Sequence, residues 1–136
     1  MGTQGNEQGT ESRFVLDAGA LIGFERGSRM ISALLEGAEE SGEEVVIPAS
    51  VLAQAWRGGA RGARLARLVD GSEIDDLNES RAKEIGLRLG ARGGRDVTDA
   101  HVVCCAAGRE ATILTSDSGD TEALLEPGEE IELIRV

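Results

Sequence analysis

The sequence predicts a three-layer α/β/α domain built on a mostly parallel sheet of about five strands. Short apolar segments alternate with segments whose apolar residues recur at helical spacing, and this alternation is typical of parallel strands joined by helices. The chain has 136 residues and 40% of them are hydrophobic, which suits one domain with its own core. Residues 1–12 are rich in Gly, Gln and Glu, so we expect a disordered leader there and a single domain over 13–136.

Five short apolar segments are the expected strands. They cover residues 13–17, 44–47, 72–77, 111–115 and 131–136. The first ends in Asp17, and the fourth is followed by Ser116 and Asp117. If these two strands are neighbours, their carboxyl ends meet at one edge of the sheet, which is where binding sites form in α/β domains.

The segments between the strands carry helix signals. We expect helices over 18–24, 28–41, 48–57, 60–69, 78–89, from Asp96 or Thr98 to about 107, and over 121–125. Ser28 and Asn78 are good N-caps, and Pro48 suits the first turn of a helix. The apolar face expected for the helix after Pro48 consists of Val51, Leu52, Ala55 and Trp56, and Gly58 and Gly59 are expected to end that helix.

The composition excludes several classes of protein. Aromatic residues are only 2% of the chain, which argues against RNA- and single-strand-binding modules that stack bases on aromatic platforms. No apolar run reaches the ~18 residues that a membrane span needs. The first residues lack the apolar region of a signal peptide.

The cysteines and the histidine offer little chemistry. Cys104 and Cys105 are adjacent, and neighbouring residues on a helix point in different directions, so we expect two buried, unpaired thiols. This predicts a cytoplasmic protein. His101 is the only histidine, so a histidine-based metal site or a Ser-His-Asp triad has little to draw on.

The net charge of −11 is unevenly distributed. Residues 57–95 contain nine basic and six acidic side chains, a net charge of +3, while the rest of the chain carries −14. Within this segment Arg57, Arg61 and Arg64 have the spacing of one helical face. The segment fits either a surface that binds a phosphate backbone or a solvated helical face with mixed charge.

Several aspartates stand at the predicted ends of elements. Asp17 and Asp117 follow strands, Asp120 comes three residues after Asp117, and Asp96 and Asp99 begin a helix. Clustered carboxylates repel one another, and a hard divalent cation such as Mg²⁺ or Mn²⁺ is the usual reason for such a cluster. Each aspartate also has a plain structural alternative as a helix cap or turn residue.

Four segments together resemble the PIN-domain family, and especially its VapC-type toxins. They are Phe14-Val-Leu-Asp17-Ala-Gly-Ala-Leu-Ile22, Val46-Ile-Pro-Ala-Ser-Val-Leu-Ala-Gln54-Ala-Trp-Arg57, Asp96-Val-Thr-Asp99-Ala-His-Val and Ile113-Leu-Thr-Ser-Asp117-Ser-Gly-Asp120. The resemblance covers nearly the whole chain from Phe14 to Val136. It implies a parallel sheet, Mg²⁺ or Mn²⁺, cleavage of RNA phosphodiesters by water, a homodimer and a small antitoxin partner.

The resemblance also implies roles for individual residues. Asp17, Asp99 and Asp117 correspond to the first, third and fourth metal-binding acids, and Asp120 matches an additional acid. Asp96 is a further candidate ligand. Ser116 is expected to hydrogen-bond a metal-bound water, with a simple turn hydroxyl as its alternative. Arg57, Arg61 and Arg64 are expected to bind RNA or, alternatively, acidic groups of an antitoxin.

Position 54 departs from the family pattern. The second acid is usually Glu, and here it is Gln54, whose amide coordinates weakly and carries no charge. Asp96 or Glu25 could compensate, so that one or two metals are held. Alternatively the site is weakened, and the domain binds RNA or a partner protein without cutting.

Two other acid-clustering folds fit less well. A receiver-type phospho-acceptor domain needs an acidic pair after the first strand and a lysine after a late strand. Here Asp17 stands alone, and the only lysine is Lys83 in an expected helix. A haloacid-dehalogenase-like phosphatase needs a second acid two residues after the first, where this chain has Gly19.

Overall fold

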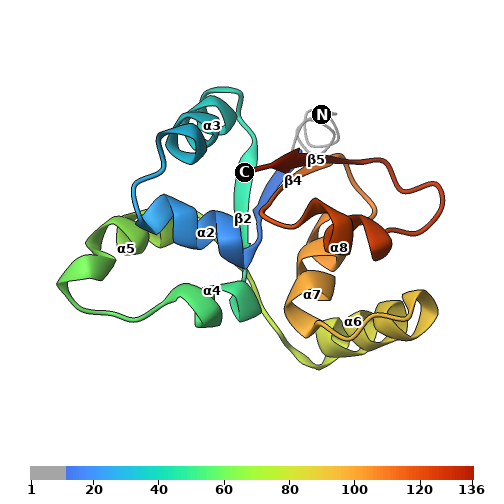
Figure 1. Cartoon of the computed structure of the whole chain (residues 1–136). Coiled ribbons are helices and arrows are strands. Elements are labelled where there is room, and N and C mark those ends of the chain that lie inside the picture. Colours follow the sequence, from blue (N-terminus) through green and yellow to red (C-terminus); the bar gives the residue numbers. More distant parts are fainter. Residues whose placement is uncertain (1–11) are drawn as a thin grey trace, which may run out of the picture.

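The computed structural model describes residues 12–136 and contains one fully parallel sheet in this range. The expected leader therefore lies outside the described residues, apart from Ser12. The strand order is β3-β2-β1-β4-β5. The strands are β1 (Arg13–Leu16), β2 (Glu44–Pro48), β3 (Glu73–Asp75), β4 (Ala111–Thr115) and β5 (Ile131–Arg135) (Figure 1).

Helices connect successive strands. They are α2 (Ala18–Glu25), α3 (Arg29–Glu40), α4 (Ala49–Ala55), the 3₁₀ turn η1 (Ala60–Gly62), α5 (Ala63–Asp70), α6 (Glu79–Arg92), α7 (Val97–Ala106) and α8 (Ser118–Ala123). Two expected caps are confirmed, since Ser28 Oγ accepts from the Ile31 N–H at 3.2 Å and Asn78 Oδ1 accepts from the Arg81 N–H at 2.8 Å. The α/β fold class predicted from the sequence is correct.

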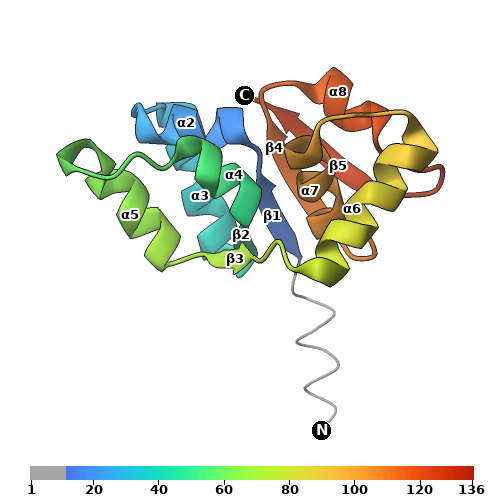
Figure 2. The same cartoon turned by 90° about the horizontal axis from the view of Figure 1, so that it is seen from below.

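Helices cover both faces of the sheet. Figure 2 shows α2, α3 and α5 on one side and α6 and α7 on the other. Helix α7 contacts β1, β2 and β4, and every residue from Ala100 to Ala106 is buried. Both cysteines are in this buried stretch, and both are free thiols as expected. The core thus lies on both faces of the sheet, against α7 on one face and against buried residues of α2, α3 and α5 on the other.

Parallel pairing of β1 with β4 positions the site. Leu16 lies opposite Leu114, so the two strands end together and Asp17 stands beside the residues that follow Thr115. A backbone hydrogen bond from the Asp17 N–H to the Leu114 carbonyl, at 3.0 Å, continues the pairing to the last turn. The condition set by the sequence analysis, that these strands be neighbours, is met.

The segment after β2 corrects three expectations. Pro48 is the last residue of β2 and the N-cap of α4, so it precedes the helix instead of lying in its first turn. Helix α4 ends at Ala55, and Trp56 is therefore not part of its packed face; the Trp56 side chain is 42% exposed. Gly58 and Gly59 were expected to end this helix, but it ends before them; their φ values of 73° and 74°, which only glycine adopts freely, belong to the loop that follows.

The same two glycines remove Arg57 from any shared helical face. Arg57 precedes them in an extended segment, Arg61 lies in η1 and Arg64 lies in α5. The three arginines therefore belong to three different local structures. The expected spacing along one helix is wrong, because the chain reverses direction between α4 and α5.

Candidate active site

Asp17 is fixed at the carboxyl end of β1. It is the N-cap of α2, and its Oδ1 accepts from the Ala20 N–H at 2.8 Å. Its Oδ2 accepts from the Ser116 N–H at 3.0 Å, which ties β1 to the end of β4. The residue is only 5% exposed. An ionised carboxylate that accepts two backbone N–H bonds is held in one orientation before any ligand arrives.

Close packing beside Asp17 requires a glycine at position 19. A Cβ on Gly19 would lie 1.9 Å from Ser116 Oγ and 2.4 Å from Ser116 Cβ. The Ser116 side chain therefore lies against the backbone of the first turn of α2. Ser116 is exposed as a residue, while its Oγ is the atom that packs closest to Gly19.

Asp117 and Asp120 share the first turn of α8. Asp117 is the N-cap, and its Oδ1 accepts from the Asp120 N–H at 3.2 Å. The pKa of Asp120 lies above its ordinary value, because its protonated carboxyl can hydrogen-bond to the neighbouring Asp117 carboxylate. Asp117 therefore caps α8, whereas Asp120, for which a cap was the structural alternative, lies inside the first turn of that helix.

Asp96 and Asp99 share the first turn of α7. Asp96 is the N-cap, with Oδ1 accepting from the Asp99 N–H at 2.8 Å. Burial, followed by the negative charges of neighbouring aspartates, raises the pKa of Asp99 to about 6. The contributing neighbours are Asp96, Asp17, Asp120 and Asp117.

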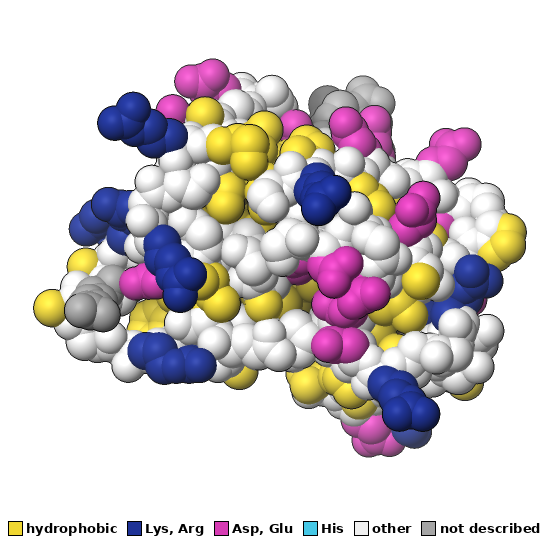
Figure 3. All heavy atoms as spheres, viewed as in Figure 1, with side chains coloured by type: hydrophobic (Ala, Val, Ile, Leu, Met, Phe, Trp, Pro, Cys, Tyr) yellow, Lys and Arg dark blue, Asp and Glu magenta, His cyan; other side chains and the backbone are white. Residues whose placement is uncertain are grey.

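The five aspartates named from the sequence thus gather at one edge of the sheet. Figure 3 shows acidic side chains grouped near the middle of one face, where α2, α7 and α8 begin. Their carboxylates repel one another enough to perturb Asp99, although no three of them bring oxygens within 4.8 Å of one another in the described structure. The arrangement is a loose ring of hard oxygen donors, a chemistry that suits Mg²⁺ or Mn²⁺.

Gln54 lies next to this ring on α4. Its Nε2 donates to Thr98 Oγ1 at 3.3 Å, and Thr98 directly precedes Asp99. The Gln54 side chain is exposed. Helix α4 packs against both α2 and α7, the helices that begin beside Asp17 and Asp99. Gln54 therefore lies beside the first turn of α7, where it offers an amide.

Glu25 does not compensate for Gln54. It is the last residue of α2, and eight residues of helix place it about 12 Å along the axis from Asp17. It is absent from the charges that perturb Asp99. Asp96, which is the largest charge contribution at Asp99, is the better candidate for that role.

Three of the nine basic side chains of the 57–95 segment are ion-paired within the fold. Arg81 pairs with Asp75 and Glu84, Lys83 pairs with Glu79, and Arg88 pairs with Glu129. The +3 segment is therefore not one continuous basic surface. Arg64 and Arg57 make no ion pair with a described residue, and the side chain of Arg61 lies outside the described structure. Figure 3 shows Lys and Arg side chains toward the edge where α3 and α5 lie.

A buried polar network lies on the other side of Gln54, and the sequence analysis missed it. His101 Nε2 donates to Asp75 Oδ1 at 2.9 Å, and His101 Nδ1 lies 2.8 Å from Ser50 Oγ. Arg81 donates to both oxygens of Asp75, at 2.9 Å and 2.8 Å. The sequence offered no specific signal for it, because Asp75 lies inside the strand expected over 72–77 and His101 lies inside an expected helix.

This network does not fit a metal ion. Asp75, His101 and Cys105 bring ligand atoms within 4.8 Å of one another. Burial alone would raise the pKa of Asp75, but hydrogen bonds from Arg81 and His101 outweigh it, so both carboxylate oxygens are charged and already engaged. Burial raises the pKa of the Cys105 thiol, which opposes the thiolate that a metal requires. We therefore assign a structural role to this network.

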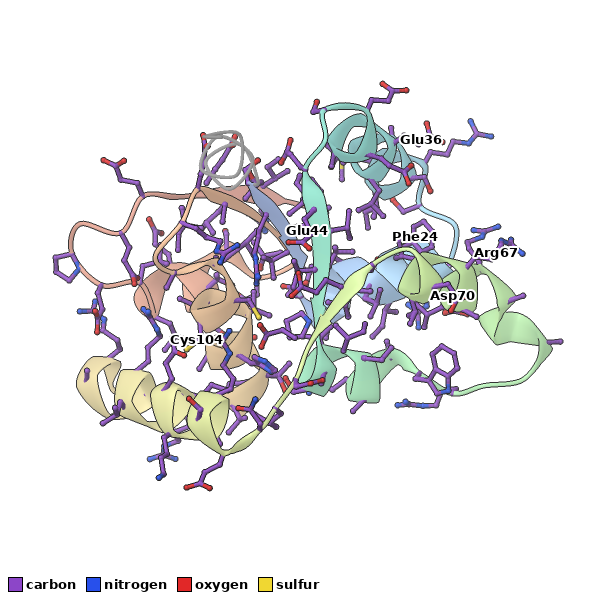
Figure 4. All side chains as sticks on the ribbon, turned by 180° about the vertical axis from the view of Figure 1, so that it is seen from behind. Phe24, Glu36, Glu44, Arg67, Asp70 and Cys104 are labelled. Carbon is purple, nitrogen blue, oxygen red and sulfur yellow. The ribbon has the colours of Figure 1, made fainter. Side chains whose placement is uncertain are left out.

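A groove opens between α3 and α5, away from the acidic ring. It has a volume of about 390 Å³ and an apolar floor that includes Phe24, Leu35 and Leu68. Figure 4 shows Glu36 on α3 and Arg67 on α5 at opposite sides of this groove, with Phe24 between them. An apolar floor with one acidic and one basic wall suits a segment of another protein better than a small polar substrate.

Comparison with known proteins shows the fold. No family model and no curated protein sequence matches this chain. A solved structure does match, a chain of VapBC2 from Rickettsia felis crystallised with a DNA fragment from their promoter. The match has a TM-score of 0.65 and 14% identity, and it covers 90% of this chain and 98% of the other. This chain has the PIN-like fold.

The PIN-like fold accounts for the coincidence of the four motifs. At 14% identity the two chains share an architecture, and the roles of individual residues are not carried over by it. The resemblance drawn from the sequence is therefore confirmed at the level of the fold. Within 12–136 no helix combines the length and the apolar character that crossing a membrane requires.

Proposed function

We propose that this PIN-like chain is a divalent-metal-dependent endoribonuclease and the toxin of a toxin–antitoxin pair. The observation that supports the proposal most is the raised pKa of Asp99, which comes from burial and from four neighbouring aspartates. Accumulated negative charge at the carboxyl edge of a parallel sheet costs stability, and a bound cation would offset that cost.

Asp17, Asp99 and Asp117 are the proposed ligands, with Asp120 or Asp96 in support. Mg²⁺ or Mn²⁺ at such a site makes water a stronger nucleophile and stabilises the leaving oxygen of a phosphodiester. Asp17 is oriented by the N–H groups of Ala20 and Ser116, so it needs little rearrangement. We assign to Gln54 the orientation of a water or a ligand, and to the Ser116 hydroxyl a hydrogen bond at the same edge.

Cleavage of an RNA pool by the purified chain with Mn²⁺ tests the proposal. Asp17→Asn is the key variant, because it keeps the size of the side chain and one of the two acceptor oxygens while it removes the charge. We expect the native chain to cut and Asp17→Asn to lose at least a hundredfold in rate. Asp76→Asn is the matched control, since Asp76 is exposed and outside the ring.

Binding of Mn²⁺ provides a second measurement that does not depend on finding the right RNA. We expect the native chain to bind Mn²⁺ and Asp17→Asn to bind it much more weakly in a calorimetric titration. An equal affinity in the two proteins would contradict the assignment of Asp17. An absence of both Mn²⁺ binding and cleavage in the native chain would reject the nuclease itself.

Gln54 supports a second candidate function, a PIN-like module that binds RNA or protein without cutting. The amide brings no charge to the ring and is engaged with Thr98. Gln54→Glu distinguishes the two functions. Activity in the native chain that changes little in Gln54→Glu favours the nuclease, whereas cutting only by Gln54→Glu favours the binding module.

We further propose a small antitoxin as a partner and a homodimer as the assembly. The VapBC2 structure supports the first, and the groove between α3 and α5 offers a surface of suitable chemistry. Light scattering of the pure chain measures the assembly. Substitution of Leu68 by Glu in the groove should abolish capture of an antitoxin while leaving RNA cleavage in place.

A further inference from the structure

Trp56 is exposed at the end of the helix that carries Gln54. It is the only tryptophan of the chain, it directly follows α4, and it is 42% exposed. An aromatic ring of this size is usually buried when it serves the core. Its exposure two residues from Gln54 makes the ring available to a ligand beside the proposed site.

The ring forms one wall of a pocket of about 420 Å³, within the size range of ligand sites. Glu25 from α2 and Leu65 from α5 line the same pocket. Gly58, Gly59 and Gly62 also line it, and a Cβ on any of them would meet nothing within 4 Å. The glycines therefore leave the pocket open to a planar group that approaches the indole.

Two charged groups of opposite sign also face this pocket. The half-buried Glu25 makes no hydrogen bond or ion pair with another side chain that the structure describes. Arg57 is held at the end of α4, where its Nη1 donates to the Trp56 carbonyl at 2.8 Å. No described carboxylate pairs with Arg57, so its remaining N–H groups are available.

We propose that this pocket is a subsite for one guanine base of the RNA, an inference that rests on the proposed ribonuclease function. Guanine offers two adjacent N–H donors, N1 and N2, which match a carboxylate such as that of Glu25. Its O6 and N7 are acceptors that arginine recognises, as Arg57 can here. Trp56 supplies the surface on which the base stacks.

The other bases fit the same groups less well. Adenine has no N–H at N1, so its edge would place a lone pair against the Glu25 carboxylate. The pyrimidines offer less surface for stacking on Trp56. The low aromatic content of the chain is consistent with this proposal. One bound base needs one aromatic ring, and no platform of several rings is required.

The subsite lies beside the proposed cleavage site and not within it. Helix α2 carries Asp17 at its start and Glu25 at its end, about 12 Å apart along the axis. Helix α4 carries Gln54 and leads directly to Trp56. A base held in the pocket would therefore fix the register of an RNA strand whose backbone reaches the acidic ring.

The fluorescence of Trp56 reports the pocket directly, because no other tryptophan contributes. The full chain is titrated with guanosine monophosphate in the presence of EDTA, so that no cleavage occurs. We expect saturable quenching with guanosine monophosphate and at least tenfold weaker binding of adenosine monophosphate. The adenine nucleotide also controls for absorption of the exciting light.

Glu25→Gln is the decisive variant, since it keeps the size of the side chain and removes the paired acceptor. We expect guanosine monophosphate to bind about tenfold more weakly to Glu25→Gln and unchanged to Glu36→Gln, an exposed acid of α3 outside the pocket. Equal quenching by the two nucleotides, or an unchanged affinity in Glu25→Gln, would overturn the proposal.

The outcome is independent of the nuclease assay. Asp17→Asn should retain the preference for guanosine monophosphate, because Asp17 does not line the pocket. Guanine-dependent quenching without Mn²⁺-dependent cleavage would reject the proposed function and keep the base subsite. Mn²⁺-dependent cleavage by a chain whose fluorescence is not quenched by guanosine monophosphate would keep the proposed function and reject the base subsite.

Discussion

Asp99 illustrates how one residue depends on distant parts of the chain. Its own sequence neighbourhood suggests only a first-turn acid that complements a helix dipole. Burial and the approach of Asp96, Asp17, Asp120 and Asp117 raise its pKa to about 6. A folded-state pKa above the ordinary 3.8 means that the charged form is disfavoured by folding, so stability is lost as the pH rises from about 4 to 6.

Asp99→Asn should therefore be more stable than the native chain at pH 8, by about 1 kcal/mol after allowance for solvent screening. The difference should vanish near pH 4, where Asp99 is protonated in the native protein. Thermal unfolding of both proteins without added metal, at the two pH values, measures this. A lower stability of Asp99→Asn at pH 8 would contradict the crowding of charge around Asp99.

Gly19 sets a steric condition for the orientation of Asp17. A Cβ there would overlap Ser116 Oγ at 1.9 Å, and the Ser116 N–H holds Asp17. Gly19→Ala should lower the free energy of unfolding by about 2 kcal/mol, because either α2 or the end of β4 must move. Urea denaturation measures it.

Gly37→Ala is the matched control for Gly19→Ala. Gly37 lies inside α3, and its Cβ would meet nothing within 4 Å. Here alanine should raise the free energy of unfolding by about 0.5 to 1 kcal/mol through the lower entropy of the unfolded chain. Equal changes of the free energy of unfolding in the two variants would show that the contact with Ser116 does not destabilise Gly19→Ala.

Helix α7 connects the proposed site to the rest of the fold. Its first turn carries Asp99, Thr98 receives the hydrogen bond from Gln54, and His101 joins Asp75 and Ser50. Strand β3, helix α4 and helix α7 are thereby linked by polar contacts. The contact of His101 with Asp75 is buried, that of His101 with Ser50 is partly buried, and that of Gln54 with Thr98 is exposed. Because these contacts are specific in geometry, they fix the rotation of α7 and hence the direction in which Asp99 projects.

Removal of the Asp75 carboxylate should lower the free energy of unfolding. Asp75→Ala leaves the Arg81 guanidinium and the buried His101 without their acceptor, and we expect a loss of about 3 kcal/mol in the free energy of unfolding. Asp76→Ala, at the neighbouring exposed position, should change it by less than about 0.5 kcal/mol. Chemical denaturation followed by circular dichroism compares the two variants.

The whole molecule is acidic, with a net charge of −11, so RNA binding must rely on a small local surface. Ion pairs within the fold take Arg81, Lys83 and Arg88 out of the basic segment. The described cations of this segment that lack a paired acid are spread over the end of α4, α5 and the end of α6; they are Arg57, Arg64, Arg67, Arg92 and Arg95. We therefore expect few phosphate contacts and a modest dependence of RNA binding on salt.

Arg64→Ala should reduce the slope of log affinity against log salt by about 0.7, the value for one phosphate contact on a single strand. The measurement uses short RNA and an Asp17→Asn background that prevents cleavage. Lys83→Ala serves as the comparison, because Lys83 is already paired with Glu79 at 2.7 Å and its loss should leave the slope unchanged. A larger reduction of this slope in Lys83→Ala than in Arg64→Ala would indicate that RNA binds at α6 instead.

The sequence by itself determined the class of fold, the strands and most helix ends. These depend on local signals, such as the apolar segment before Asp17 and the caps at Ser28 and Asn78, which the tertiary structure reinforces. It also placed Asp17 and Asp117 at the ends of two strands that prove to be neighbours. Asp96, Asp99 and Asp120 were named from helix starts and from the resemblance, and the role of all five as ligands stays a prediction.

Only the tertiary structure decided how those residues act together. The perturbation of Asp99, the contact of Gln54 with Thr98 and the pairing of Asp75 with His101 join residues far apart in the chain. The exposure of Trp56 depends on two left-handed glycines that redirect the chain. Burial, ion pairing and pocket shape are properties of non-local packing, and a local pattern of residue types does not encode them on its own.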